Sequence, residues 1–109
     1  MKIMLFRDGQ RGVVIKLPGE RPVEEIGELL GGGAEQWPAR LSCRLALYRR
    51  EDGTGLPERY ELHRLGRVPE PVAGDCAVVA MGPDGRMKDL TVNDVAEAQA
   101  KVRMRGKFA

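Results

Sequence analysis

The stretch that decides the fold runs over residues 53–95; it begins GTGLPERYEL and ends AGDCAVVAMGPDGRMKDLTVNDV. Within it, residues 76–81 are apolar at every position, which predicts a central strand covered on both faces. Gly-Pro-Asp-Gly at 82–85 is a tight turn, and residues 86–88 can return beside the strand as an edge strand. A turn this short joins only antiparallel strands, so the sheet is expected to be antiparallel here.

A helix is predicted directly after this hairpin. Thr91 suits the N-cap and Asp94 the third helical position, where the two form a capping-box-like pair. Leu90 and Val95 have the spacing of a hydrophobic staple around that cap. The expected apolar face of the helix consists of Val92, Val95, Ala96, Gln99 and Val102.

The first third of the chain predicts a hairpin followed by a helix. Residues 2–7 and 13–17 are apolar and rich in strand-forming types, and Asp and Gly in the segment between them supply the turn. Pro22 suits a first helical turn, and Gly31-Gly32-Gly33 ends the helix with a left-handed cap. A short strand is expected at 34–37.

The clearest alternation in the chain covers residues 40–48 and predicts a half-buried strand. Leu41, Cys43, Leu45 and Leu47 are expected on the core face. Arg40, Ser42, Arg44, Ala46 and Tyr48 are expected on the solvent face. Residues 56–71 are expected to be a long irregular excursion, with a short extended piece at 60–65.

Together these elements predict one α+β domain over residues 1–109, with a mainly antiparallel sheet of about four to six strands and two helices. The 18 basic and 16 acidic residues give a net charge of only +2, and a basic C-terminal tail is expected over about 103–109. The opening residues do not resemble a signal peptide and no apolar run is long enough to cross a bilayer, so a cytoplasmic protein is expected. Cys43 and Cys76 are expected to be buried free thiols.

Catalytic chemistry is not predicted. His63 is the only histidine and Ser42 the only serine, and neither has the neighbours that a base or nucleophile requires. The glycines at 31–33 follow a helix, whereas a phosphate loop precedes one. We therefore expect a protein that is not an enzyme and that has neither a cofactor nor a metal site.

The chain resembles the family catalogued as domain of unknown function 3846. The motifs that carry the resemblance are the Lys-apolar opening strand, Leu29-Leu30-Gly31-Gly32, Leu45-Ala46-Leu47-Tyr48, Gly55-Leu56-Pro57, Gly74-Asp75 and Asp89-Leu90-Thr91. Glu58-Arg59 after the Gly-Leu-Pro, and the longer basic end, depart from the family pattern. The resemblance implies a small accessory protein of a phage, plasmid or integrated element.

The expected function is binding to a host protein and inhibition or modulation of it, with anti-CRISPR or anti-restriction activity as the specific form. The residues expected to bind the partner are Arg40, Arg44, Tyr48 and Arg50, because arginine and tyrosine are enriched at interfaces. Two alternatives remain: a nucleic-acid-binding protein that uses the same Arg/Tyr face and the basic tail, and a sponge for a signalling nucleotide. A monomer or small homo-oligomer is expected.

Overall fold

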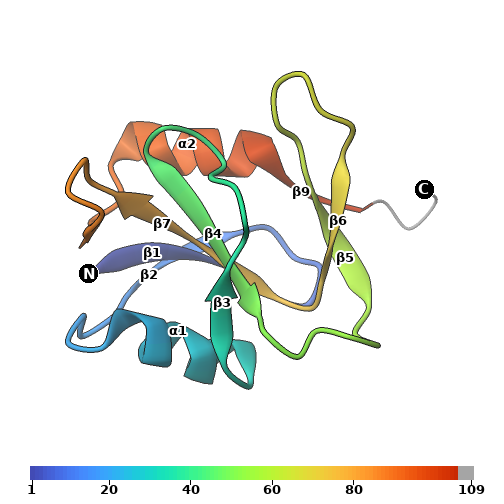
Figure 1. Ribbon diagram of the computed structural model, residues 1–109, viewed down its shortest axis with the longest axis horizontal. Coiled ribbons are helices and arrows are strands. Elements are labelled where there is room, and N and C mark those ends of the chain that lie inside the picture. The colour runs from blue at the N-terminus through green and yellow to red at the C-terminus, as the bar shows by residue number, and fades with distance from the viewer. Residues whose placement is uncertain (106–109) are drawn as a thin grey trace.

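The computed structural model describes residues 1–105 and shows an α+β arrangement of two helices and mainly antiparallel sheets, as the sequence predicts (Figure 1). In chain order its elements are β1 (Lys2–Phe6), β2 (Val13–Lys16), α1 (Pro22–Leu30), β3 (Ala34–Gln36), β4 (Leu45–Arg50), β5 (Glu58–Leu62), β6 (Glu70–Ala73), β7 (Cys76–Met81), β8 (Met87–Lys88), α2 (Val92–Lys101) and β9 (Val102–Met104).

The large sheet has the strand order β2-β1-β7-β4-β3, with β8 beside β7. Its strand pairs are antiparallel, and the two predicted hairpins, β1–β2 and β7–β8, are confirmed. All six residues of β7 are buried, as predicted for a central strand. The reason is that both faces of the large sheet are covered.

One face of the large sheet packs against α1. Ile26 and Leu30 of this helix share a buried apolar cluster with Ile3, Ala46 and Val79 of the sheet. Figure 1 shows α1 and α2 on opposite sides of the sheet. The other face therefore needs a separate cover, which a single helix of ten residues does not supply alone.

That cover is α2 together with a small sheet of strand order β6-β5-β9. Tyr60 and Leu62 of the small sheet and Ala98 of α2 lie in one buried cluster with Leu45 and Leu47 of the large sheet. Our prediction of an irregular segment at 56–71 was partly wrong. β5 lies within it and overlaps the extended piece expected at 60–65, and β6 begins in it at Glu70. Their buried residues are few and separated by charged ones, so the apolar signal is weak.

The predicted strand at 40–48 begins later than expected, at Leu45. The Ser42 hydroxyl accepts hydrogen bonds from the backbone N–H groups of Arg44 (3.3 Å) and Leu45 (3.2 Å), so this segment is bent. Such local bonds compete with strand pairing. As a result Cys43 is exposed rather than buried, and Cys76 is buried as predicted.

The solvent face predicted for β4 is also wrong. Ala46 and Tyr48 are buried against the α1 side of the large sheet, and burial raises the pKa of Tyr48. The alternating sequence predicts that one face of the strand is exposed to solvent. Ala46 is apolar, however, and Tyr48 is amphipathic. A strand covered on both sides accepts them equally well.

Both ends of α1 and the start of α2 have the predicted residues and hydrogen bonds. Pro22 occupies the first turn of α1, and Gly31 caps its end with a φ of 87°. The Thr91 hydroxyl accepts the Asp94 N–H at 3.2 Å, and the Asp94 carboxylate accepts the Thr91 N–H at 2.9 Å, which completes the capping box of α2.

The predicted apolar face of α2 is partly wrong. Val92 is 86% exposed, and Val102 has left the helix to begin β9. Neither helix within residues 1–105 has the length and apolar character needed to span a membrane.

Candidate functional site

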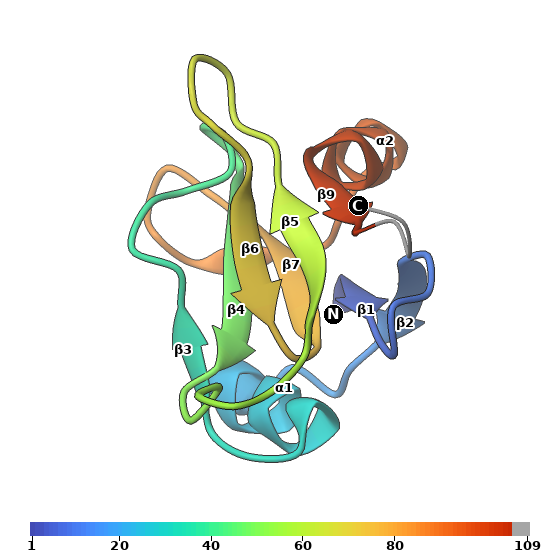
Figure 2. The same ribbon diagram turned by 90° about the vertical axis from the view of Figure 1, so that its right-hand side faces the viewer.

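The most unusual surface feature is the connection between β5 and β6, residues 63–69, which we call the finger. Figures 1 and 2 show it projecting away from the rest of the molecule. At its tip Leu65 is 98% exposed and Val68 is 82% exposed. Single exposed apolar residues are common, but two at one projecting tip form a candidate contact surface.

The tip of the finger is held by a β-turn. The Arg67 N–H donates to the Arg64 carbonyl at 3.1 Å, and Gly66 has a φ of 73°. A positive φ at the third turn position is the mark of a type II turn and favours glycine there. Leu65 therefore sits on the corner of a hydrogen-bonded turn and points to solvent.

An ion pair holds the base of the finger. The Arg64 Nε donates to Glu70 Oε1 at 3.1 Å, and Nη2 of the same guanidinium contacts the same oxygen. Only 12% of the Arg64 side chain is exposed. This pair joins the two ends of the finger, since Arg64 follows β5 and Glu70 begins β6.

The charge exposed at the tip is positive. Arg67 is exposed and makes no ion pair with any carboxylate of residues 1–105. His63 directly follows β5, and its Nε2 lies 3.6 Å from Glu61 Oε2, too far for a strong hydrogen bond. Within the described part of the chain, the finger therefore presents an apolar tip with one free cation.

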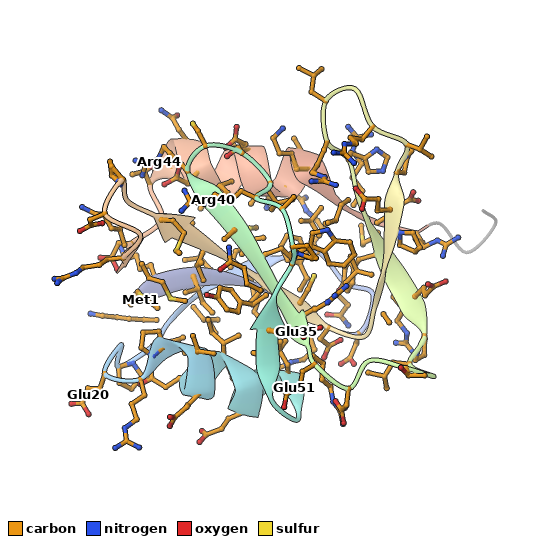
Figure 3. All side chains as sticks on the ribbon, viewed as in Figure 1. Met1, Glu20, Glu35, Arg40, Arg44 and Glu51 are labelled. Atoms are coloured by element: carbon orange, nitrogen blue, oxygen red, sulfur yellow. The ribbon has the colours of Figure 1, made fainter. Side chains whose placement is uncertain are left out.

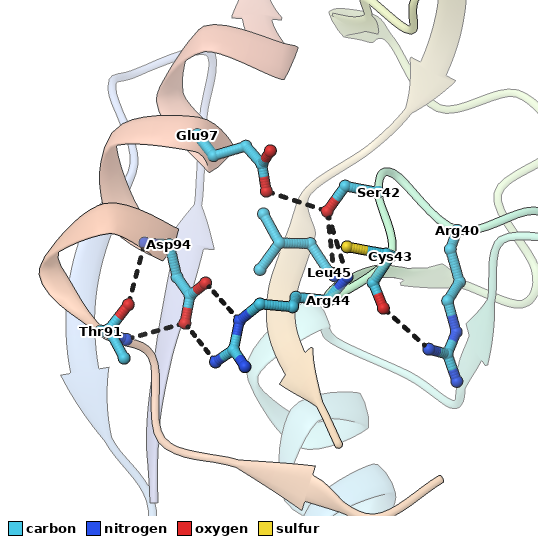
Figure 4. Close-up of polar contacts among 8 residues, drawn as sticks. All are labelled: Arg40, Ser42, Cys43, Arg44, Leu45, Thr91, Asp94 and Glu97. Carbon is cyan, nitrogen blue, oxygen red and sulfur yellow. Dashed lines mark hydrogen bonds and ion pairs between the residues drawn. The ribbon is translucent and has the colours of Figure 1, made fainter. Parts of the chain in front are cut away.

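The four residues predicted to bind a partner do not form one face. Figure 3 places Arg40 and Arg44 near the start of β4, far from Glu35 of β3, which pairs with Arg49 near the other end of β4. Tyr48 is buried, and Arg50 lies at that far end with Asp52. Arg40 and Arg44 are close in sequence, but Figure 4 shows their guanidinium groups directed apart.

Arg44 is occupied by a structural contact. Its Nε donates to Asp94 Oδ1 and its Nη2 to Asp94 Oδ2, both at 3.1 Å (Figure 4). Asp94 is only 4% exposed. The Arg44 hydrogen bonds lower the pKa of Asp94 to about 2 against the opposing effect of burial, and the bonds with Thr91 add to the lowering.

A neighbouring contact extends this link between β4 and α2. The Ser42 hydroxyl donates to Glu97 Oε1 at 2.9 Å, while Arg40 donates to the Cys43 carbonyl at 3.2 Å (Figure 4). Arg44 and Ser42 thus attach the segment before β4 to α2, and Arg40 does not reach the helix.

A polar cleft of about 630 Å³ lies where β4 ends, and it is the second candidate site. Arg49 and Arg50 line it, but both are paired. Arg49 donates to Glu35 at 3.1 Å with its guanidinium 4.4 Å from the centre of the Trp37 ring, and Arg50 donates to Asp52 at 2.6 and 3.2 Å.

The charges of this cleft do not favour an anion. Besides the two arginines it is lined by Glu35, Glu51 and Glu58. The Arg50 hydrogen bond lowers the pKa of Asp52, so that carboxylate stays ionised beside the cleft. A nucleotide phosphate would have to compete with carboxylates already bound to the arginines.

No group of three His, Cys, Asp or Glu side chains in residues 1–105 is placed to hold a metal ion.

Sequence reasoning missed the finger because its apolar residues follow neither the helical nor the strand period. Leu65 and Val68 stand between Arg64, Gly66, Arg67 and Pro69, a composition typical of a turn. The one available signal was the presence of large apolar side chains inside such a turn, where polar residues are usual.

Comparisons with models of protein families, with curated proteins and with solved structures find no match to this chain. The resemblance to domain of unknown function 3846 therefore stays a prediction.

Proposed function

We propose that this protein is a binding module that engages a partner protein by placing the tip of its finger in an apolar recess. The observation that carries the proposal is the exposure of Leu65, on the projecting hydrogen-bonded turn, and of Val68, which directly follows that turn. Moving one leucine side chain from water into an apolar site gains about 2 kcal/mol, which is about thirtyfold in affinity.

The order of the finger supports this role. Binding immobilises side chains and loops at a cost that a pre-ordered segment largely avoids. The turn at Gly66 and the Arg64–Glu70 ion pair hold the finger before any partner arrives. Pro69 further restricts Val68 to extended conformations.

The charge of the finger indicates the chemistry of the recess. Arg67 lies beside the apolar tip without an ion-pair partner in residues 1–105. A partner with a carboxylate at the rim of an apolar recess would complement it. The specific form expected from the family resemblance, inhibition of a host defence protein, remains a prediction.

The nucleic-acid alternative is weakened at the expected Arg/Tyr face, where Arg44 and Arg50 are paired and Arg40 makes no ion pair among residues 1–105. Arg44, Arg49, Arg50, Arg64 and Arg105 are each paired with a carboxylate. Affinity for phosphates depends on the number of free cations that can neutralise them. Each of these arginines would have to break an existing ion pair before it could contribute.

Leu65→Asp is the variant that tests the proposal, and Val92→Asp is its matched control. Both change an exposed apolar residue to the same acid, but Val92 lies on α2. Partners are captured from bacterial lysate with and without nuclease and identified by mass spectrometry. Each partner is then purified and titrated with each variant by calorimetry.

We expect Leu65→Asp to lose at least about thirtyfold in affinity for the purified partner while Val92→Asp binds as the wild type does. Equal binding by the wild type and Leu65→Asp would overturn the proposal. A capture that disappears with nuclease would instead support the nucleic-acid alternative.

A further inference from the structure

A groove of about 250 Å³ separates the turn of the β1–β2 hairpin from β9. Phe6, Arg11 and Gly12 line it on the hairpin side, and Val102, Arg103 and Met104 line it on the side of β9. Figure 2 shows β9 next to this hairpin, at the edge of the small sheet. The groove is distinct from the finger, and a ligand bound in the groove need not contact the finger.

The backbone of β9 is open toward one side. The Arg105 N–H donates to the Arg59 carbonyl at 2.8 Å, and the Lys101 carbonyl accepts the His63 N–H at 2.7 Å. Because an antiparallel ladder alternates, residues 101, 103 and 105 use their polar groups toward β5, and those of Met104 face the other way. Among residues 1–105, β5 is the only strand paired with β9.

Among residues 1–105, the Met104 N–H and C=O therefore have no strand partner and can pair with a further strand. The Val102 carbonyl faces the same way, while its N–H already donates to Ala98. An open edge of this kind is the structural requirement for binding by strand addition, in which main-chain hydrogen bonds supply affinity and side-chain pockets supply specificity.

Part of the groove wall is apolar, formed by Phe6, Val102 and Met104. Val102 is buried, and Met104 is 47% exposed. A Cβ atom at Gly12 would lie 2.6 Å from the Phe6 ring, so this position requires glycine and leaves its backbone uncovered by a side chain. An extended peptide could place apolar side chains beside Met104 and the hairpin.

The charge of the groove is of one sign. Arg11 and Arg103 line it, and no carboxylate of residues 1–105 does. On a strand, Arg103 points to the face opposite to that of Val102 and Met104. The groove thus offers an apolar face and a cationic face to a peptide whose residues alternate.

We propose that this groove binds an acidic, apolar segment of a partner protein in extended conformation, added as a strand to the open edge of β9. Two other segments that could occupy the groove, the C-terminal end of the same chain and strand β2 of a second copy, carry a positive charge. The chain's own end carries Lys107, and the edge strand β2 of a second copy carries Lys16. Both would bring a cation toward Arg11 and Arg103.

The probe is a fluorescein-labelled synthetic peptide of alternating glutamate and valine, with a lysine–valine peptide as its charge control. Binding to the full chain is measured by fluorescence polarisation and by two-dimensional NMR of the backbone amides. We expect the glutamate peptide to shift the amides of Val102, Arg103 and Met104 saturably, and the lysine peptide to leave them unchanged.

Met104→Pro removes the outward N–H, and Met104→Ala keeps it. Proline is tolerated on an edge strand where its nitrogen faces away from the ladder, so both variants should fold. We expect Met104→Pro to bind the glutamate peptide at least about tenfold more weakly than Met104→Ala does, the effect of losing one main-chain hydrogen bond. Arg11→Glu should also weaken binding, and Leu65→Asp should not, which separates this test from that of the finger.

Four outcomes would overturn the proposal: no saturable shift at millimolar glutamate peptide, equal binding by Met104→Pro and Met104→Ala, binding that appears only after deletion of residues 106–109, or a sedimenting dimer that Met104→Pro dissociates. The third outcome would assign the groove to the chain's own end, and the fourth to a second copy.

Discussion

Arg44, directly before β4, donates two hydrogen bonds of 3.1 Å to Asp94 in the first turn of α2. Asp94 is buried and also closes the capping box with Thr91. One carboxylate therefore caps the start of a helix and attaches that helix to the large sheet. Arg44, one of the residues expected to bind a partner protein, therefore makes a structural contact within the domain.

Arg44→Glu should destabilise the fold, and Arg40→Glu should not. The first change places a carboxylate against buried Asp94. Arg40, by contrast, donates a hydrogen bond only to the Cys43 carbonyl among residues 1–105. We expect Arg44→Glu to lower the melting temperature by more than about 5 °C, measured by circular dichroism. Equal melting temperatures for the two variants would show that the contact with Asp94 contributes nothing.

Stability should fall in acid because of Asp94. Its pKa is lowered to about 2 in the folded protein, below the ordinary value of 3.8, so its contribution is present above that ordinary value and is lost as the pH falls toward 2. The size of the effect is on the order of 2 kcal/mol of unfolding free energy. Urea titrations at several pH values should show a steeper loss in the wild type than in Asp94→Asn, and parallel pH profiles would contradict this assignment.

The turn of the finger should depend on Gly66. An alanine there must adopt a φ near 73°, which costs about 1 kcal/mol, whereas asparagine tolerates that region better. Gly66→Ala should therefore speed hydrogen exchange of the Arg67 amide, which donates across the turn, more than Gly66→Asn does. Unchanged exchange in Gly66→Ala would mean that the turn does not hold the tip.

The two thiols should react at very different rates. Cys43 is exposed in the bent segment before β4, and Cys76 is fully buried in β7 with its thiol pKa raised by burial. Titration with a thiol reagent should label one cysteine rapidly and the second only after denaturant is added. Cys43→Ser should remove the rapid phase, and a rapid phase that persists in this variant would contradict the burial of Cys76.

Local signals in the sequence determined the elements whose chemistry is complete within a few residues. The turn at 82–85, the Thr91–Asp94 capping box, Pro22 at the start of α1 and the cap at Gly31 were all predicted correctly. Each depends on a backbone conformation or a hydrogen bond between near neighbours, so the tertiary structure has little to add.

The tertiary structure alone decided which residues are free to act. Arg44 and Asp94 are 50 residues apart, and their contact exists only because the small sheet and α2 cover one face of the large sheet. On the opposite face, α1 covers Ala46 and Tyr48, so a strand face that was expected to be exposed to solvent is part of the core. The strands β5 and β6 bury Tyr60, Leu62 and Val72 in the core. The finger that connects them extends beyond the core and is therefore exposed. Alternation of apolar and polar residues predicts which residues lie on each face of a strand. Which segments cover each face depends on parts of the chain that are distant in sequence.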